Sequence, residues 1–503
     1  MKTKSCPPRA SAMIESLRGM GYTTGSAIAD VIDNSISARA TVIQLDFGWN
    51  GKDSFIRISD NGHGLTAEKL DQAMVLGSTN PLESRSTSDL GRFGMGLKTA
   101  SLSQCRRLTV AAKVDTEVNY RCWDLDVLAT STGDEWTLLL EPFLSSRGLC
   151  QEPLESGFAT VVLWEGLDKV VTPGFQERDF FDLIDEVERH LAMTFHRFLE
   201  GQSPQVRLYI NGNTQNERVR PWDPFMCSHD ATMATPVEIL HGGVAVQGYV
   251  LPHRDKMSNA EFEAGSGPAG WVSRQGFYVY RGNRLLVTGS WLGLGEGRPW
   301  PKDDLHRLAR ISLDLPNTLD HEWRIDIKKS TARPPVHLRS RLVELAKSVR
   351  ADARRVFTHR GEVRSDGETR MTFPAWMVST STVGARYRID EAHPVIARIL
   401  EESGPYAGRI RQLLRVIEET VPIQRIWLDS AETVDKDPLP IDEGVPDDLM
   451  ELLRDEYRSL ITSKGLSPDQ ARRQLSRTTP FHRFPKAIAM LGDNQQQNAG
   501  ATP

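Results

Sequence analysis

The chain has 503 residues, more than one hydrophobic core ordinarily serves, so we expect two or three domains. Its formal net charge of −5 excludes binding to nucleic acid through overall positive charge. Any contact with nucleic acid must therefore come from a local basic patch. Charged residues make up 25% of the chain, and no apolar run reaches the length of a membrane span, which indicates a soluble protein.

The cysteines and the amino-terminal residues indicate the compartment. Five cysteines are scattered along the chain without a Cys-x-x-Cys pair, which argues against a disulfide framework or a zinc site and fits a reducing environment. Residues 1–8 are polar and lack the apolar segment of a signal peptide. We therefore expect a cytoplasmic protein that has no membrane partner.

Helical and strand patterns alternate along the first part of the chain. Isoleucines recur at helical spacing over 25–38, which predicts an amphipathic helix. Residues 41–47 and 54–59 flank the Asn50-Gly51 pair, a pattern typical of a β-hairpin. The other predicted elements are helices at 11–20, 70–76, 98–103 and 180–199, a polar lid at 77–90, and strands at 108–112, 119–127, 136–141 and 160–164. This order predicts a layered α/β sandwich.

A second unit is predicted over 201–360 and a third over 371–490. The second unit shows strand patterns followed by one long helix, at 206–210, 244–251, 276–281, 285–287, 309–315 and 337–359. Residues 360–370 are polar and are predicted to be a linker, and the tail at 491–503 is predicted to be disordered. The third unit is predicted to be mainly helical, with one strand near 424–428.

Asp30 and Asn34 lie four residues apart on the first amphipathic helix, so their side chains share one face. An amide oxygen suits Mg²⁺, which prefers oxygen ligands, and a carboxylate one turn away can hold or deprotonate an attacking water. Asp33 is a competing acid, but the helical rotation turns it away from the Asn34 face. The alternative is a helix with solvated polar residues.

Asp60 ends a predicted strand and enters an Asn-Gly-His-Gly turn. A carboxylate in this place can accept a hydrogen bond from an exocyclic amine, and Gly62 and Gly64 let the backbone approach a planar ring. The alternative is an ordinary turn between a strand and a helix, in which His63 has no chemical role.

A glycine-rich segment follows, in which Gly91, Gly94 and Gly96 precede Lys98. Such a loop can present bare N–H groups to phosphates at the start of a helix, whose dipole favours anions, while Lys98 adds a positive charge. Neither a Walker loop nor a dinucleotide fingerprint fits, because no Ser or Thr follows a Gly-Lys pair and no strand leads directly into the segment. The alternative is a flexible surface loop.

In this order, the three segments resemble the asparagine box and the two glycine boxes of the GHKL ATPase superfamily. This superfamily includes gyrase B subunits, MutL, histidine kinases, MORC proteins and the ninety-kilodalton heat-shock chaperone. The resemblance implies a Bergerat-type ATP-binding domain over 1–200, an overall α+β fold class, and ATP and Mg²⁺ as cofactors.

The resemblance also implies a role for each residue of the three segments. Asn34 is implied as the metal ligand and Asp60 as the residue that reads adenine, with Gly62 and Gly64 in the turn beside it. Thr160 matches the family's late strand threonine near the adenine, although a β-branched residue is also routine in a strand. The implied phosphate lid consists of Gly91, Gly94, Gly96 and Lys98.

One departure from the family concerns the general base, which is usually Glu and is Asp30 here. The Asp side chain is shorter by one methylene, so a directly held water would sit differently. We expect ATP binding to survive this change and hydrolysis to be slow, unless the backbone brings Asp30 closer.

The second unit resembles, more loosely, the transducer domain of MutL, gyrase and MORC proteins. In that domain a lysine on a loop after a strand reaches the γ-phosphate, and Lys328 and Lys329 stand where it is expected, with Lys329 slightly preferred. The alternative is an exposed lysine pair at a strand end. The following helix and its flanks are basic and are predicted to bind the backbone of DNA or RNA. The alternative is a solvated surface. The basic residues are Arg333, Arg339, Arg341, Lys347, Arg350, Arg354, Arg355 and Arg360.

The resemblance implies a slow, Mg-dependent ATPase that acts as a nucleotide-gated clamp. We expect ATP binding to close the lid and to drive formation of a homodimer. By analogy with relatives, the expected partners are DNA and operon-encoded proteins. The expected role is in DNA repair or in defence against foreign DNA. Two alternatives stay open: a chaperone-like ATPase that acts on protein clients, and a nucleotide-gated scaffold with little turnover, which Asp30 favours.

Overall fold

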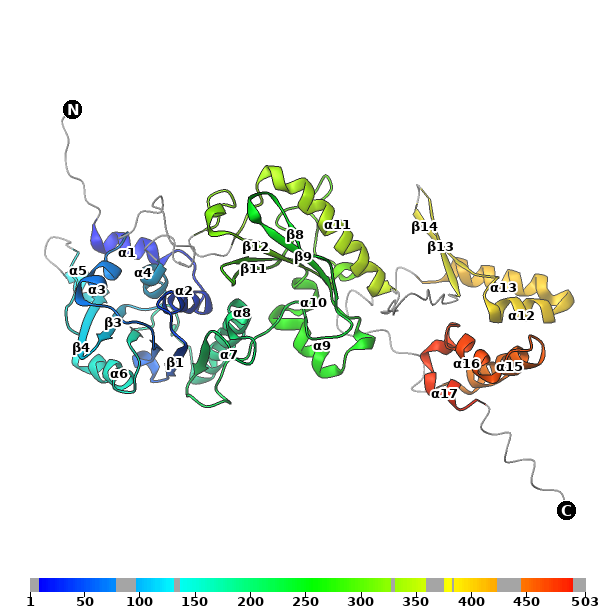
Figure 1. The fold of residues 1–503 in the computed structure, drawn as a ribbon, viewed down its shortest axis with the longest axis horizontal. Coiled ribbons are helices and arrows are strands. Elements are labelled where there is room, and N and C mark those ends of the chain that lie inside the picture. Colours follow the sequence, from blue (N-terminus) through cyan, green and yellow to red (C-terminus); the bar gives the residue numbers. More distant parts are fainter. Residues whose placement is uncertain are drawn as a thin grey trace, which may run out of the picture. The chain divides into compact units, whose positions relative to one another are not determined.

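The computed structural model describes residues 9–77, 96–130, 136–326, 331–358, 375–381, 384–422 and 445–491 (Figure 1). The chain forms two compact units, Met1–Glu362 and Val363–Pro503. The described ranges leave out most of the predicted lid and the tail, as well as Gly91, Gly94, Lys328, Lys329 and the predicted strand near 424–428. Within these ranges no helix combines the length and the apolar character needed to cross a bilayer.

Among the described residues, six strands form the first sheet of the first unit, in the order β4-β3-β5-β2-β1-β6 (Figure 1). The strands are β1 (Val42–Gly48), β2 (Phe55–Asp60), β3 (Arg107–Val114), β4 (Glu117–Asp124), β5 (Thr160–Glu165) and β6 (Arg207–Ile210). Neighbouring strands are antiparallel, except that β6 runs parallel to β1. The predicted hairpin of β1 and β2 is confirmed, whereas the prediction that 206–210 opens the second unit is wrong. A short alternating pattern marks a strand but does not reveal which sheet the strand joins.

Seven helices among the described residues share one hydrophobic core on one face of the first sheet. They are α1 (Ala10–Arg18), α2 (Thr24–Ser37), α3 (Ala67–Met74), α4 (Gly96–Leu102), α5 (Leu125–Thr130), α7 (Glu177–Thr194) and α8 (His196–Leu199). Helix α2 begins at a capping box, in which the Thr23 side chain accepts from the Ser26 N–H (3.2 Å). Its isoleucines at helical spacing are buried against the sheet, as the sequence predicts.

The opposite face of the first sheet is covered by α6 (Leu144–Glu155), a helix that the sequence analysis does not predict. Its buried residues form a small core with β3 and β5. Pro153 lies inside this helix, and a proline within a run of weak periodicity ordinarily argues against a helix. The predicted strand at 136–141 is wrong, because its described residues form only one isolated bridge, between Leu139 and Cys122.

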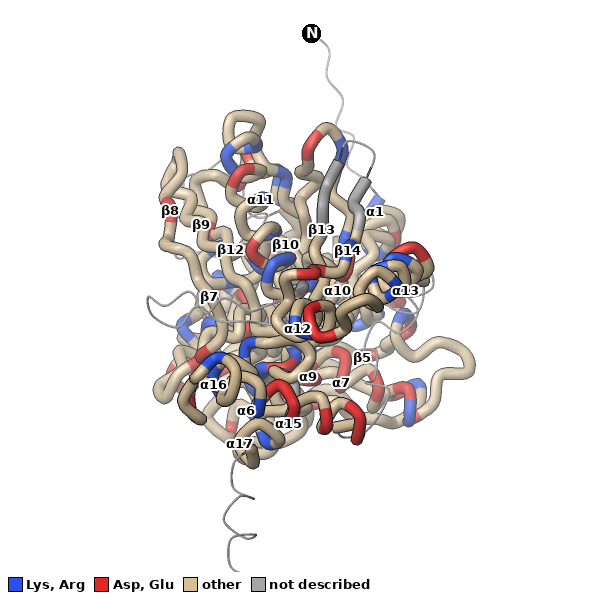
Figure 2. Tube along the Cα trace, turned by 90° about the vertical axis from the view of Figure 1, so that its right-hand side faces the viewer, with Lys and Arg blue, Asp and Glu red and all other residues tan. Residues whose placement is uncertain are grey.

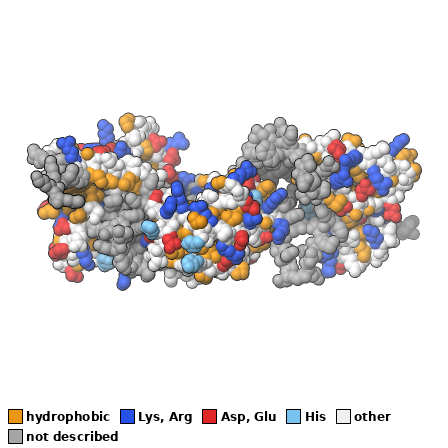
Figure 3. Space-filling view, turned by 90° about the horizontal axis from the view of Figure 1, so that it is seen from above, with side chains coloured by type: hydrophobic (Ala, Val, Ile, Leu, Met, Phe, Trp, Pro, Cys, Tyr) orange, Lys and Arg blue, Asp and Glu red, His pale blue; other side chains and the backbone are white. Residues whose placement is uncertain are grey.

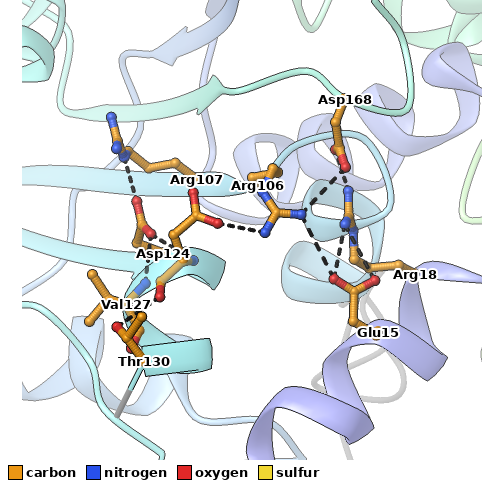
Figure 4. Close-up of polar contacts among 9 residues, drawn as sticks. Glu15, Arg18, Arg106, Arg107, Asp124, Val127, Thr130 and Asp168 are labelled. Carbon is orange, nitrogen blue, oxygen red and sulfur yellow. Dashed lines mark hydrogen bonds and ion pairs between the residues drawn. The ribbon is translucent and has the colours of Figure 1, made fainter. Parts of the chain in front are cut away.

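An ion-pair network joins Arg18 of α1 to Arg106 and Asp168 (Figure 4), and Arg18 also reaches the end of α4. The Arg18 guanidinium donates from Nε to the carbonyl of Leu102 (2.7 Å) and pairs with Asp168. Arg106 extends the network, since its guanidinium lies 3.6 Å from the other Asp168 oxygen. Leu102 ends the helix that begins at Gly96, so this network holds the helix onto which the glycine-rich segment leads.

The first unit continues with a second sheet, in the order β11-β10-β12-β9-β7, with β8 also paired to β9. Its elements are β7 (Met233–Ala234), β8 (Glu238–Ile239), β9 (Ala245–Val250), α9 (Asn259–Ser266), α10 (Gly270–Ser273), β10 (Gly276–Arg281), β11 (Arg284–Ser290), β12 (Ala309–Leu315) and α11 (Val336–Thr358). Helix α11 lies across one face of this sheet, and its apolar residues enter the core there (Figure 1). The predicted strands at 244–251, 276–281 and 309–315 and the long helix after them are confirmed, as is the α+β fold class.

The two sheets of the first unit meet at α7 and α8. Met193 of α7 shares a small core with Tyr280 and Leu285 of the second sheet. Arg197 of α8 pairs with Asp314 of β12, and its guanidinium covers the Tyr280 ring at 3.5 Å. Packing and charge together therefore hold the second sheet against the helices of the first.

The second compact unit is mainly helical, as predicted, and also contains an antiparallel hairpin that was not predicted. Its described elements are β13 (Trp376–Ser381), β14 (Gly384–Ile389), α12 (Pro394–Glu402), α13 (Ala407–Thr420), α15 (Asp447–Thr462), α16 (Pro468–Leu475) and α17 (Pro485–Ala489). Leu453, Leu460, Leu475 and Phe481 form its core.

Candidate active site

Helix α2 places a buried acid beside the start of α4. The Asp30 carboxylate is buried, and its Oδ2 accepts a hydrogen bond from the Tyr22 hydroxyl (3.0 Å). The same oxygen lies 3.8 Å from the position that a Cβ on Gly96 would take. The structure thus brings Asp30 to the described end of the glycine-rich segment, where a phosphate chain is expected.

Asn34 lies one turn after Asp30 and is exposed. Its Nδ2 donates to the backbone carbonyl of Asp30 (3.2 Å). Because this bond uses the nitrogen of the amide, the amide oxygen is available as an acceptor or a metal ligand. An oxygen that is exposed beside a buried carboxylate fits Mg²⁺, which keeps several waters and shares its remaining positions with phosphates.

Asp60 is buried at the end of β2 and is held from two sides. Its Oδ2 accepts from the Ser35 hydroxyl of α2 (2.8 Å), and its Oδ1 accepts from the Gly62 N–H (2.9 Å). Burial raises the pKa of the Asp60 carboxyl, and the two donors partly offset that effect by favouring the ionised form. Each oxygen keeps a further lone pair, so the carboxylate can accept from an exocyclic amine.

The turn after Asp60 requires its two glycines. Gly64 has φ +65°, and a Cβ there would lie 2.1 Å from the carbonyl oxygen of Lys113. A Cβ on Gly62 would lie 2.8 Å from the carbonyl oxygen of Ala38. Thr160 lies directly opposite Asp60 in the register of β5 and β2, so the structure gathers the predicted adenine side at one strand end.

Lys98 has a position that the sequence does not reveal. Its side chain is buried, and Nζ donates to the carbonyls of Ala73 (2.9 Å) and Val75 (2.8 Å) at the end of α3. Burial lowers the pKa of the Lys98 ammonium to about 8. The structure therefore places this charge on the carbonyl end of a helix, and its contact with a phosphate stays a prediction.

Tyr22 is a site residue that the sequence analysis missed. Burial, followed by the neighbouring Asp30 carboxylate, raises the pKa of the Tyr22 phenol, so the hydroxyl stays protonated and donates. The Asp326 carboxylate adds the smallest contribution in the same direction. A turn tyrosine ahead of the helix carries no sequence signal for this role.

Arg284 of β11 is the second missed residue. Its Nε donates to both carboxylate oxygens of Asp33 (2.9 and 2.8 Å), and a terminal nitrogen lies 3.5 Å from Asp30 Oδ1. This contact directs Asp33 toward the second sheet, and its orientation relative to Asn34 stays a prediction. Asp33 and Arg284 stand 251 positions apart in the chain, which only the tertiary structure can connect.

Helix α11 pairs much of its basic charge within its own unit. Arg341 contacts Glu238 through two nitrogens (2.7 Å each), and Lys347 pairs with Glu296 (2.5 Å). Arg350 is buried, with its guanidinium 4.7 Å from the ring centre of Trp291. Basic and acidic residues are interspersed along the described chain (Figure 2), and over α11 they stand side by side in the space-filling view (Figure 3). A DNA-binding face on α11 stays a prediction, and Arg360 lies outside the described residues.

Comparisons with known proteins agree with this geometry. Residues 22–146 match the family described as "Histidine kinase-, DNA gyrase B-, and HSP90-like ATPase". The chain is also similar to proteins named DNA mismatch repair protein MutL. That of Colwellia psychrerythraea is 26% identical over 271 residues, which are 52% of this chain and 36% of the relative. That of Shewanella loihica is 26% identical over 230 residues, which are 45% of this chain and 34% of the relative. That of Proteus mirabilis is 26% identical over 234 residues, which are 45% of this chain and 32% of the relative. The matches thus span about a third of these relatives' length.

Proposed function

We propose that this chain binds ATP with Mg²⁺ and hydrolyses it slowly, which is supported by the match of residues 22–146 to the histidine kinase-, DNA gyrase B- and HSP90-like ATPase family. The observation that carries the proposal is the position of the Asp30 carboxylate. It lies on α2, which also presents Asn34, and is 3.8 Å from the Cβ position of Gly96, the first residue of α4. The fold thus brings the acid and the metal-ligand candidate of α2 close to the start of α4, the helix proposed to bind phosphates.

We assign the nucleotide's two ends to the two ends of this site. Asp60 accepts from the adenine amine, beside Gly62, Gly64 and Thr160. At the other end, Asn34 holds Mg²⁺, which when bound offsets the negative charge of the phosphates. The phosphates are bound by the backbone N–H groups of Gly91, Gly94 and Gly96 and by the Lys98 ammonium. The γ-phosphate is also contacted by Lys328 or Lys329.

In the proposed reaction, Asp30 acts as the general base. Water attacks the γ-phosphorus, its proton passes to the Asp30 carboxylate, and ADP leaves. The Tyr22 hydroxyl occupies one side of Asp30 Oδ2 and so limits the orientations of the carboxylate. Because Asp is one methylene shorter than Glu, the water must come closer to α2, and slow turnover is the expected result.

We further propose that ATP binding drives formation of a homodimer that acts as a clamp on DNA. The support is the similarity over half of the chain to proteins named for DNA mismatch repair, together with a second sheet seated on the ATPase domain. A role in defence against foreign DNA and the involvement of operon-encoded partners rest on the sequence resemblance alone.

The test combines turnover with molecular mass. Purified protein should release phosphate from ATP only with Mg²⁺, and Asp30→Asn should abolish release while retaining ATP binding. Light scattering should show a doubled mass with a non-hydrolysable ATP analogue, and duplex DNA should be retained most strongly in that state. Binding of the analogue without any change in mass would reject the clamp while leaving the ATPase intact.

A nucleotide-gated scaffold with little turnover is the second candidate function, and the presence of Asp at position 30 favours it. Asp30→Glu separates the two. A sharp rise in turnover in this variant supports the scaffold, because the natural chain then carries a weakened base. Robust turnover that the substitution leaves unchanged supports the enzyme.

A further inference from the structure

Arg284 links the second sheet to the helix that carries the proposed base. It is the first residue of β11, whereas Asp30 and Asp33 both lie on α2, which packs on the first sheet. Its guanidinium holds Asp33 at 2.8 Å and reaches Asp30 at 3.5 Å. A cation of the second sheet is thus shared by two carboxylates of α2, the helix that packs on the first sheet.

The burial of these three side chains makes their positions depend on one another. Their exposed fractions are 5% for Arg284, 2% for Asp30 and 1% for Asp33. Little water is present to screen the charges, and two carboxylates on adjacent helical turns repel each other unless a cation lies between them. A displacement of the Arg284 guanidinium therefore acts on both acids.

The contacts of Asp30 are unequal. Tyr22, in the turn that precedes α2, donates to Oδ2 at 3.0 Å, whereas Arg284, from the second sheet, stands 3.5 Å from Oδ1. The longer contact changes first when the second sheet shifts. An aspartate also has one side-chain torsion fewer than a glutamate, so it cannot compensate by extending toward the water.

From this geometry we infer that Arg284 is a positioning residue, which sets the orientation of the Asp30 carboxylate according to how the second sheet is seated on the first. Asp33 anchors the guanidinium, and the contact with Asp30 transmits its position. Hydrolysis, but not nucleotide binding, then depends on the contact that Arg284 of β11 makes with α2. This inference rests on the proposed ATPase function.

The experiment uses variants that remove the bridge without leaving the Asp33 charge buried opposite a neutral side chain. Arg284→Gln/Asp33→Asn replaces the ion pair by a neutral hydrogen-bonded pair, and Arg284→Lys keeps the charge but not a fork able to reach both acids. Arg197→Gln/Asp314→Asn is the matched control, because it also neutralises a pair between the two sheets but leaves α2 untouched. The full chain is used throughout, with circular dichroism to confirm folding.

We expect Arg284→Gln/Asp33→Asn to lower kcat by about a hundredfold, the scale of a reacting group displaced by about 1 Å. The Kd of a non-hydrolysable ATP analogue should stay close to that of the wild type. Arg284→Lys should also lose kcat, and the control pair should keep it. Asp30→Asn removes the carboxylate itself, so it should abolish turnover with or without the Arg284→Gln/Asp33→Asn change, because Arg284 acts through Asp30.

Two results would overturn the inference. One is wild-type kcat in the folded Arg284→Gln/Asp33→Asn variant, and the other is an equal loss of kcat in the Arg197 control, which would indicate a general structural effect. Failure of the proposed function looks different, since the wild type itself would then neither bind the analogue nor release phosphate.

Discussion

Helices α2 and α11 both stand out in the sequence for their charged residues, yet the structure uses those charges in opposite ways. On α2 the acids are few and buried, and each is held by a named donor from elsewhere in the fold. On α11 the basic residues are many, but Arg341 pairs with the half-buried Glu238 and Lys347 with an exposed acid, and Arg350 is buried beside tryptophans. Charge counted along a sequence therefore indicates a site only when its partners are known.

The largest contrast should appear in stability. Arg284→Gln leaves Asp33 buried without its counter-ion, and loss of one partner of a buried pair costs about 3–5 kcal/mol of the free energy of unfolding. Arg341→Gln removes an exposed pair on α11 and should leave this free energy unchanged. Urea unfolding of the two variants measures the difference. Equal effects would break the comparison between the helices.

The second contrast concerns pH. His190 of α7 lies under the start of α2, where its ring would be 3.1 Å from a Cβ on Gly25, and burial, followed by the nearby arginines, lowers its pKa from 6.5 to about 4. Between these two values the unfolded chain binds a proton that the folded protein excludes. The free energy of unfolding should therefore fall as the pH falls through this window, by up to about 3 kcal/mol.

Urea unfolding between about pH 7 and about pH 4 tests this slope. His190→Gln should remove the contribution, whereas His337→Gln, at an exposed position on α11, should retain it. A slope that is identical in both variants and the wild type would contradict a neutral, half-buried imidazole beneath α2.

The third contrast concerns ligand binding. Asn34→Ala should weaken the Mg-dependent affinity for ATP by at least about tenfold, since even indirect partners of a metal site have effects of this size. Stability should not change, because Asn34 is exposed. Ser37→Ala, at another exposed position on α2, is the control, and calorimetry with and without Mg²⁺ is the measurement. The same loss in both variants would remove Asn34 from the site.

The smallest effect is expected on α11. Lys347 pairs with Glu296, so Lys347→Gln should change the slope of log K for duplex DNA against log salt by much less than about 1. Filter binding over a range of salt measures this slope. A fall of about 1 would show that Lys347 contacts a phosphate, and would restore α11 as the DNA-binding face predicted from the sequence.

The comparison also explains which parts of the molecule were predictable. The α2 helix, the β1–β2 hairpin and the turn after Asp60 follow local rules of periodicity and turn chemistry, and the sequence predicts them. Helix α6 contains a proline and lacks strong periodicity, so local rules miss it. The sheet joined by β6 and the bridge from Arg284 depend on contacts between distant positions, which no local pattern encodes.

The candidate site shows the same division. Residue types and spacing indicate Asp30, Asn34 and Asp60, but not that Tyr22 and Arg284 hold two of the acids in place. Nor does the sequence show that the Lys98 ammonium lies on the carbonyls that end α3. Donors that come from turns and from another sheet become visible only when the packing is known.

Calorimetric titration with a non-hydrolysable ATP analogue and Mg²⁺ tests the nucleotide site most directly, with Asp60→Ala as the comparison. The wild type should bind one analogue per chain, and the variant should lose most of that heat while remaining folded by circular dichroism. A wild type that takes up no analogue, or an Asp60→Ala variant that binds as tightly as the wild type, would contradict the assignment of this site to ATP.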